Sequence, residues 1–150
     1  MKKSPYDKIY EKKCVVCGEI FFASKTGNGE CSHCGWYNNN LSEENENDVI
    51  FPNVVSLNKA KKLYSEGKPL KPDLCDFMDM LYYYSGAVFL YKGLNCCLFL
   101  HGNTDTKIEF SWSPDNVYYF SDKDDFINNA KIGNEFVRDI WSDVENPKYI

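Results

Sequence analysis

Two short cysteine motifs constrain this 150-residue chain more than any other feature. Cys-Val-Val-Cys-Gly at 14–18 and Cys-Ser-His-Cys-Gly at 31–35 each separate two thiols by two residues and then place a glycine. The short gap lets both sulfurs of a turn point the same way, and glycine readily adopts the positive φ that reverses the chain. Between the motifs, a strand-like segment at 19–23 precedes turn residues at 25–29. We therefore expect a hairpin that brings four sulfurs together.

Four thiolates are typical ligands of a structural zinc ion. We predict that Cys14, Cys17, Cys31 and Cys34 bind one Zn²⁺ in a zinc ribbon, and that His33, inside the second turn, is exposed rather than a ligand. With four sulfurs in the tetrahedron no position is open for water, so the metal would be structural and not catalytic. The alternative is a redox C-x-x-C pair, which would need only one motif, usually at the start of a helix.

The cysteine count and the start of the chain indicate the compartment. Seven cysteines is an odd number, and paired C-x-x-C motifs are typical of metal binding rather than of a disulfide framework. Residues 1–13 are polar and basic with no apolar stretch behind them, so we expect no signal peptide, no membrane span and a cytoplasmic location. Apolar residues at 43% and aromatic residues at 16% are enough for a folded core.

Charge is distributed unevenly along the chain. Residues 1–40 carry +2, residues 41–50 carry −4, residues 51–72 carry +4 and residues 73–150 carry −7, which gives −5 overall. Because the C-terminal half is acidic, it binds phosphate poorly, and we expect any contact with nucleic acid to be made by the first half.

Hydrophobic periodicity predicts the remaining elements. Helical spacing indicates helices near 57–66, 73–84, 122–130 and 135–144, with Ser56 and Ser121 as caps. After Gly86 the period changes to two, which predicts a four-stranded antiparallel meander with strands Ala87–Tyr91, Leu94–His101, Lys107–Trp112 and Val117–Phe120. The second of these strands is apolar on both faces, so we expect it to be covered on both sides.

These elements predict an α+β fold in three parts. A zinc ribbon at 1–40 is followed by an acidic linker at 41–52 and by an α+β domain at 53–150, in which helices pack on the meander.

No catalytic motif is visible in the sequence. Cys97 and His101 share one face of a predicted strand, but four residues at about 3.3 Å each hold them roughly 13 Å apart, too far for a thiol–imidazole pair. Cys75 and Cys96 are interpreted as small core residues. We therefore expect a protein that is not an enzyme.

Two parts of the chain resemble known families. The ribbon, followed by Gly35-Trp36 and then by Asn53-x-x-Ser56-Leu57-x-x-Ala60, is similar to small bacterial cysteine-rich proteins of the CPCC type. Those proteins have a Cys-Pro-Cys-Cys-Gly turn, where this chain has Val15 and Val16 between the first two cysteines. Residues 89–145 are similar to a meander-plus-helices module of small Firmicutes proteins, through Phe89-x-Tyr91-Lys92-Gly93 and Ile140-Trp141-x-x-Val144-Glu145. Taken together, the resemblances imply zinc binding by the ribbon, a cytoplasmic location and a role as an immunity or accessory partner.

Three functions are weighed. The first is a zinc-binding, non-enzymatic protein-interaction module, such as an immunity or inhibitor protein, whose acidic half and surplus tyrosines suit a basic protein partner. The second is a nucleic-acid-associated regulator that uses the lysines of the first half. The third, a zinc or thiol enzyme, would need an open metal position or a thiol–base pair. We favour the first, with no membrane role and the oligomeric state left open.

Overall fold

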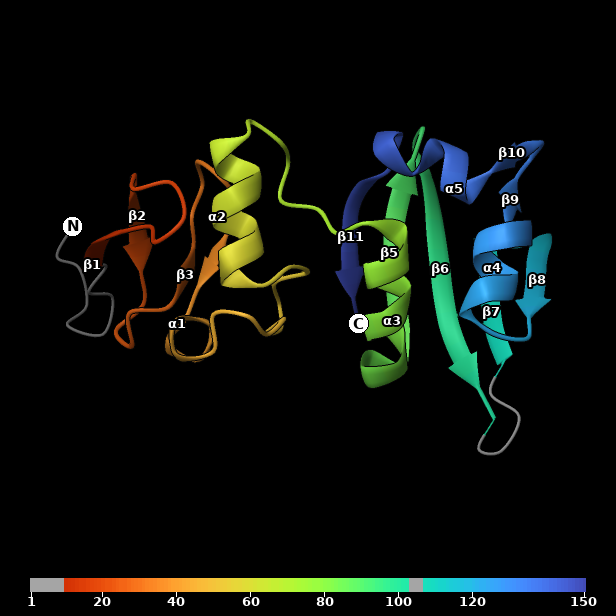
Figure 1. Ribbon diagram of the computed structural model, residues 1–150, viewed down its shortest axis with the longest axis horizontal. Helices are drawn as coiled ribbons and strands as arrows, with labels where there is room; N and C mark the ends of the chain where they lie inside the picture. The colour runs from red at the N-terminus through yellow and green to blue at the C-terminus, as the bar shows by residue number, and fades with distance from the viewer. Residues whose placement is uncertain (1–9, 103–106) are drawn as a thin grey trace, which may run out of the picture. The chain divides into compact units, whose positions relative to one another are not determined.

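The computed structural model describes residues 10–102 and 107–150. The chain divides into two compact units, unit 1 (Met1–Leu70) and unit 2 (Lys71–Ile150), which are described separately (Figure 1). The turn expected at 102–105 lies, apart from Gly102, outside the described residues. Within the described ranges, no helix has the length and apolar character needed to cross a membrane. Helices combined with antiparallel sheets confirm the α+β class.

Unit 1 consists of two antiparallel hairpins followed by two helices. The elements are β1 (Tyr10–Lys13) paired with β2 (Ile20–Ala23), β3 (Gly29–Glu30) paired with β4 (Tyr37–Asn38), α1 (Asn40–Glu44) and α2 (Leu57–Ser65). The predicted cap of α2 is confirmed, because Ser56 Oγ accepts a hydrogen bond from the Lys59 N–H at 3.2 Å.

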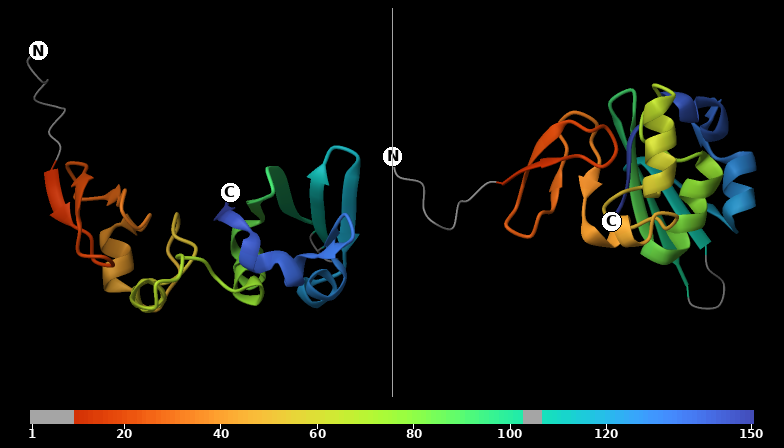
Figure 2. Two further views of the ribbon diagram at one scale, coloured as in Figure 1. Left: turned by 90° about the horizontal axis from the view of Figure 1, so that it is seen from above. Right: turned by 60° about the vertical axis from the view of Figure 1, so that its left-hand side comes forward.

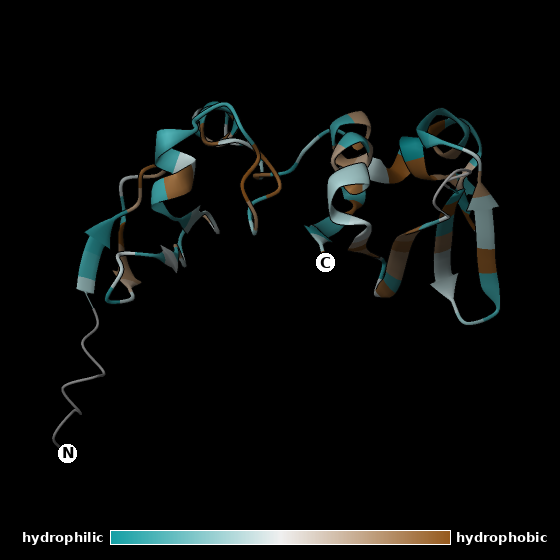
Figure 3. Cartoon of the chain, turned by 90° about the horizontal axis from the view of Figure 1, so that it is seen from below, coloured by the Kyte–Doolittle hydropathy of each residue, from teal (hydrophilic) through white to brown (hydrophobic). Residues whose placement is uncertain are grey.

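Helix α2 belongs to unit 1 rather than to the domain expected at 53–150. Its buried Leu57 and Ala60 pack in one cluster with Cys14 and Cys31. Polar residues separate Leu57 and Ala60 along α2, as expected for a helix with one buried side, and Figure 3 shows hydrophobic and hydrophilic segments alternating along unit 1. Two small hairpins cannot bury a core by themselves, so the helix completes it. The domain boundary is therefore corrected from 52/53 to Leu70/Lys71.

The segment expected as an acidic linker at 41–52 is attached to the rest of unit 1. Helix α1 occupies its first part, and Asn39 caps that helix by accepting a hydrogen bond from the Ser42 N–H at 2.7 Å. Further on, the Asn58 N–H donates to the Glu46 carbonyl at 3.0 Å. Asparagine and serine favour helix caps as well as loops, so composition alone could not separate the two.

Unit 2 contains a five-stranded antiparallel sheet in the order β11-β5-β6-β7-β8. Its elements are α3 (Leu74–Tyr84), β5 (Gly86–Tyr91), β6 (Leu94–His101), β7 (Lys107–Ser113), β8 (Asn116–Phe120), α4 (Lys123–Asn129), β9 (Lys131–Ile132), β10 (Glu135–Phe136), α5 (Val137–Ile140), the 3₁₀ turn η1 (Trp141–Asp143) and β11 (Glu145–Tyr149). The four strands expected from the alternation are all present, and the sheet gains β11 as a fifth.

Aromatic side chains build the core of unit 2 between the helices and one face of the sheet. Phe126 of α4 lies edge-on to Phe110 and Phe120 with ring centroids 5.2 and 5.3 Å apart. Phe77 of α3 stacks on Tyr149 of β11 at 5.0 Å. Figure 2 shows α3 and α4 on the same side of the sheet. Burying each such ring contributes about 1.5–3 kcal/mol.

The end of the chain differs from the expected helix at 135–144. Only Val137–Ile140 is α-helical there, preceded by β10 and followed by η1 and the strand β11. The apolar residues that predicted the helix are instead buried from several short elements. Helix α4 is also capped one residue later than expected, because Asp122 rather than Ser121 accepts from the Asp125 N–H at 2.7 Å.

The central strand β6 is covered on one side only. Its Cys96 and Leu98 are buried beneath the helices, whereas Phe99 on the opposite face is 37% exposed. The expectation of cover on both sides is therefore wrong for this unit, and the sheet has an open outer face.

Candidate metal centre

The two cysteine turns fold in the same way, each at the tip of a hairpin. In each turn the glycine N–H donates to the carbonyl of the first cysteine, at 2.9 Å in the first turn and 2.8 Å in the second. The N–H of that cysteine donates to the carbonyl of the residue after the glycine, at 2.8 Å in both. Gly18 and Gly35 have φ of 78° and 81°, which other residues adopt only with strain. The hairpins therefore surround the two turns, whereas the sequence predicted one hairpin between them.

The turns bring the four predicted sulfurs together. The ligand atoms of Cys14, Cys17, Cys31 and Cys34 all lie within 4.8 Å of one another. Two pairs of sulfurs from different turns lie close together, with Cys14 Sγ and Cys34 Sγ 3.6 Å apart and Cys17 Sγ and Cys31 Sγ also 3.6 Å apart. In a tetrahedron with metal–sulfur bonds of about 2.3 Å, neighbouring sulfurs are about 3.8 Å apart. The residues present therefore fit a metal ion with four thiolate ligands.

The surroundings of the sulfurs differ in how they affect ionisation. Burial opposes ionisation of Cys14, but hydrogen bonds from the Cys17 N–H, the Asn38 amide and the Val16 N–H outweigh it and lower its pKa. For Cys17 and Cys34, burial dominates and raises the pKa above the ordinary value. Thiols this close together cannot all ionise without a cation between them. A metal ion would supply that charge.

A buried asparagine joins the two hairpins beside the sulfurs. Asn38, which is 4% exposed, donates from Nδ2 to Cys14 Sγ at 3.5 Å and to the Trp36 carbonyl at 3.4 Å. Its Oδ1 accepts from the Val15 N–H at 3.1 Å. The sequence predicted no role for this residue. The only signal was its position four residues after Cys34, within a run of three asparagines.

A second asparagine holds the next segment against the site. Asn53 Oδ1 accepts from the Tyr37 N–H at 2.9 Å, and Asn53 Nδ2 donates to the Tyr37 carbonyl at 2.8 Å. This side chain satisfies both backbone groups of a strand residue, as a neighbouring strand would. It positions the chain that leads into α2 next to the cysteine turns.

His33 lies outside the group of sulfurs and is exposed, as expected. Its Nε2 lies 3.5 Å from the hydroxyl of Tyr64 on α2, and the two rings meet edge-on at 6.5 Å. Burial is the largest cause of the raised pKa of Tyr64, followed by the negative charge of Cys17. This contact joins the second cysteine turn to α2.

The other residues considered for chemistry remain apart. Cys97 and His101 lie on the outer face of β6 four positions apart, and His101 Nε2 is 3.4 Å from Glu109 Oε1 rather than near a thiol. Cys96 is buried, as expected, and burial raises its pKa to about 12. Cys75 is exposed on α3, so its interpretation as a core residue is wrong.

Comparison of the chain with protein-family models, with curated proteins and with solved structures found no match. The described residues thus contain a group of four cysteines, held by two like-folded turns, at distances suited to binding a metal ion.

Proposed function

We propose that this group binds one structural Zn²⁺ ion and that the hairpins around it form a zinc ribbon. The four thiolates would hold the ion, and the ion would cross-link two hairpins too small to be stable separately. Binding of this kind contributes about 10–16 kcal/mol of apparent free energy to folding. The observation that supports it most directly is the spacing of 3.6 Å between sulfurs from different turns.

Metal analysis of the purified chain tests this proposal. We expect one zinc per chain by elemental analysis and native mass spectrometry, with loss of the metal in Cys34→Ser and retention in Cys75→Ser, whose thiol lies on α3. Four thiolates also suit iron, which would give visible absorption bands that zinc lacks. An iron spectrum, or an oxidised metal-free protein, would contradict the zinc assignment.

We further propose that unit 2 is a non-catalytic protein-binding domain that recognises a basic protein partner. Residues 71–150 contain seven Lys or Arg against thirteen acids, a net charge of −6. Six of the acids occur on or beside the neighbouring helices α3 and α4, at Asp73, Asp76, Asp79, Asp122, Asp124 and Asp125. This group is called the acidic helical face.

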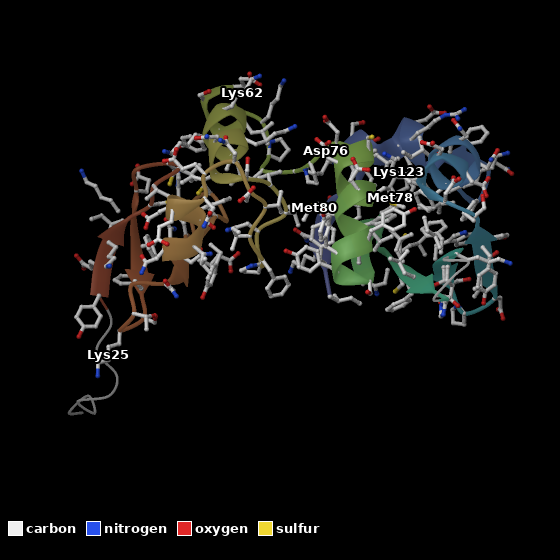
Figure 4. The ribbon with its side chains drawn as sticks, turned by 60° about the horizontal axis from the view of Figure 1, so that its bottom comes forward. Lys25, Lys62, Asp76, Met78, Met80 and Lys123 are labelled. Carbon is white, nitrogen blue, oxygen red and sulfur yellow. The ribbon has the colours of Figure 1, made fainter. Side chains whose placement is uncertain are left out.

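The acidic helical face also carries interface-type aromatic side chains. Tyr82 and Tyr83 are 44% and 81% exposed on α3. Lys123, labelled with Asp76 in Figure 4, joins the helices through an ion pair with Asp79 at 2.6 Å and a backbone hydrogen bond to the Tyr82 hydroxyl. Exposed tyrosines among acids suit a partner with a basic surface, such as a nucleic-acid-processing enzyme inhibited by an immunity protein.

Affinity purification from the native host with matched variants tests this role. The double variant Asp76→Asn/Asp124→Asn neutralises the acidic helical face, and Asp48→Asn removes an exposed acid from unit 1 as a control. We expect one basic protein to be retained by the wild type and the control and lost with the double variant. Recovery of the same proteins with all three baits would argue against this role.

Binding of nucleic acid by unit 1 is the second candidate. Lys13, Lys25, Lys61 and Lys62 are exposed there, and Lys62 points away from α2 in Figure 4. Residues 1–70 nevertheless contain ten lysines against nine acids, a net charge of only +1, so the affinity for phosphate would be low. Salt-sensitive binding of the intact chain to DNA or RNA would favour this candidate over the first.

A further inference from the structure

The two edges of the unit 2 sheet differ in how open they are to another strand. Strand β11 forms one edge and β8 the other, and Figure 1 shows β8 at the margin of the sheet beside β7. Within residues 10–102 and 107–150, β8 pairs with β7 alone. Every second residue of an edge strand directs its N–H and C=O groups away from the neighbouring strand, so β8 has backbone groups with which a further strand could pair.

The β11 edge is blocked against strand addition. Pro147 lacks an N–H, Asn146 has a φ of 50°, and the register with β5 shifts between Glu145 and Lys148. Proline, a bulge and a lysine on an edge strand are devices that prevent another strand from pairing there. An added strand would therefore meet a disrupted backbone on this side of the sheet.

The β8 edge is open by comparison. Its sequence, Asn-Val-Tyr-Tyr-Phe at 116–120, contains no proline and no charged residue. Val117, Tyr118 and Tyr119 are 41%, 46% and 60% exposed. Because side chains alternate along a strand, Val117 and Tyr119 lie on one face and Tyr118 on the other. Aromatic and β-branched side chains stabilise cross-strand pairs, so an added strand would find contacts on both faces.

Acidic residues at both ends of β8 identify the kind of strand that fits. Asp115 precedes the strand, and Asp122 and Asp124 follow it. Lys123, between the last two, forms an ion pair with Asp79 of α3 at 2.6 Å, so its charge is already paired. An uncharged strand about 17 Å long thus lies between two acidic ends. A matching strand has Lys or Arg at its ends and uncharged side chains between them.

We propose that β8 binds an extended segment of a basic protein, which adds to the sheet as a sixth strand. The segment carries Lys or Arg at both ends, near Asp115 and Asp122, and its backbone pairs with the outward N–H and C=O groups of β8. This inference rests on the proposed binding of a basic protein by unit 2 and names the part of the partner that is recognised. Because Asp122 and Asp124 also belong to the acidic helical face, that face is continuous with the β8 edge.

A synthetic peptide tests the proposal on the full metal-loaded chain. The probe is a heptapeptide with lysine at both ends and alternating valine and threonine between them, so that its charges are about 20 Å apart when it is extended. We expect it to shift the amide signals of residues 116–120 in NMR spectra and to slow their hydrogen exchange. The same peptide N-methylated at its central residues keeps every side chain but loses donors on both edges, and it should bind at least about tenfold more weakly.

Matched variants locate the contact. Val117→Lys and Tyr118→Lys should each weaken binding of the plain peptide at least about tenfold, because a lysine would face the uncharged centre of the probe. Ile150→Lys makes the same change of charge at an exposed position beyond β11 and should have little effect. Asp115→Asn should weaken binding about threefold, whereas Asp48→Asn in unit 1 should not. Two edge variants keep the test valid if one of them fails to fold.

The outcomes separate this inference from the proposed function. Equal binding of the plain and N-methylated peptides, or signal shifts confined to α3 and α4, would overturn strand addition and leave the acidic helical face as the site for a basic partner. Absence of binding at a probe concentration of about 1 mM would also overturn it. Whether unit 2 captures a basic protein is decided separately, by the affinity purification with the Asp76→Asn/Asp124→Asn bait.

Discussion

The side-chain amide of Asn38 donates a hydrogen bond to Cys14 Sγ at 3.5 Å, while its oxygen accepts one from the Val15 N–H at 3.1 Å. One side chain from the second hairpin thus orients the first cysteine turn. Groups that orient metal ligands in this way contribute to metal affinity, although they do not touch the metal themselves.

Substitution of Asn38 should weaken metal binding without removing a ligand. Asn38→Ala loses the donor to Cys14 and leaves the Val15 N–H without its acceptor, so we expect affinity about 10- to 100-fold lower in competition with a chelator. Asn38→Asp keeps the acceptor but places a carboxylate oxygen beside the sulfur, and should be worse than alanine. The control is Asn40→Ala, at the exposed start of α1. Equal effects of Ala and Asp would indicate that the amide only fills space.

Removal of the metal should unfold unit 1 and leave unit 2 folded. Cys14 and Cys31 are part of the buried cluster of unit 1, together with Trp36. Unit 2 has a core of its own, with Phe77 and Phe110 fully buried. After chelation, amide signals of residues 10–70 should collapse to unfolded positions in NMR spectra, while those of unit 2 stay in place. Loss of both sets together would show that unit 2 depends on the metal.

Lys71 should stabilise unit 2 through its ammonium group. Its Nζ donates to the carbonyls of Trp141, of Ser142 at 3.2 Å and of Val144 at 2.8 Å. Burial lowers the pKa of this lysine, opposed by Asp143. Lys71→Met keeps the aliphatic chain but leaves these carbonyls without the donor. We therefore expect the free energy of unfolding, measured in urea titrations, to fall by about 1–3 kcal/mol.

Lys68→Met is the matched control for that experiment. Its side chain is 63% exposed and pairs with Glu66 at 3.1 Å, an arrangement worth little to stability. We expect the urea midpoint of unit 2 to stay unchanged in this variant. A similar effect of both substitutions would mean that the carbonyl contacts of Lys71 contribute nothing.

Tyr149 should make unit 2 sensitive to alkaline pH. Its hydroxyl donates to the Phe77 carbonyl at 3.1 Å, and burial raises its pKa well above the ordinary 10.0. Because the pKa of Tyr149 is higher in the folded state, its protonated hydroxyl contributes fully to the stability of unit 2 below about pH 10. This contribution is lost as the pH rises further. Tyr149→Phe should lower the free energy of unfolding by about 0.5–1.5 kcal/mol at neutral pH, because the hydrogen bond to the Phe77 carbonyl is lost. It should also lose less stability than the wild type above pH 10.

Denaturation curves at neutral and alkaline pH check this expectation. The exposed Tyr83→Phe serves as the control and should match the wild type at every pH. Parallel alkaline losses in the wild type and Tyr149→Phe would assign the sensitivity to other groups.

The sequence by itself determined the features that depend on neighbouring residues. The spacing of Cys14, Cys17, Cys31 and Cys34 predicted the group that the structure brings together. Periodicity predicted α2, α3 and the strands β5 to β8, because burial on one side leaves a regular pattern in a continuous segment.

Only the tertiary structure decided the features that join distant segments. β11 contains Pro147 and has no regular alternation, yet it pairs with β5 more than fifty positions earlier in the chain. The sequence did not distinguish Asn38 from a loop residue, because its hydrogen bond to Cys14 joins two separate hairpins. The open face of β6 was likewise unpredictable, because an apolar strand has the same sequence pattern whether one or both of its faces are covered. The local sequence pattern predicts whether a residue is buried or polar. Which residue it contacts or hydrogen-bonds is determined by the packing of distant segments.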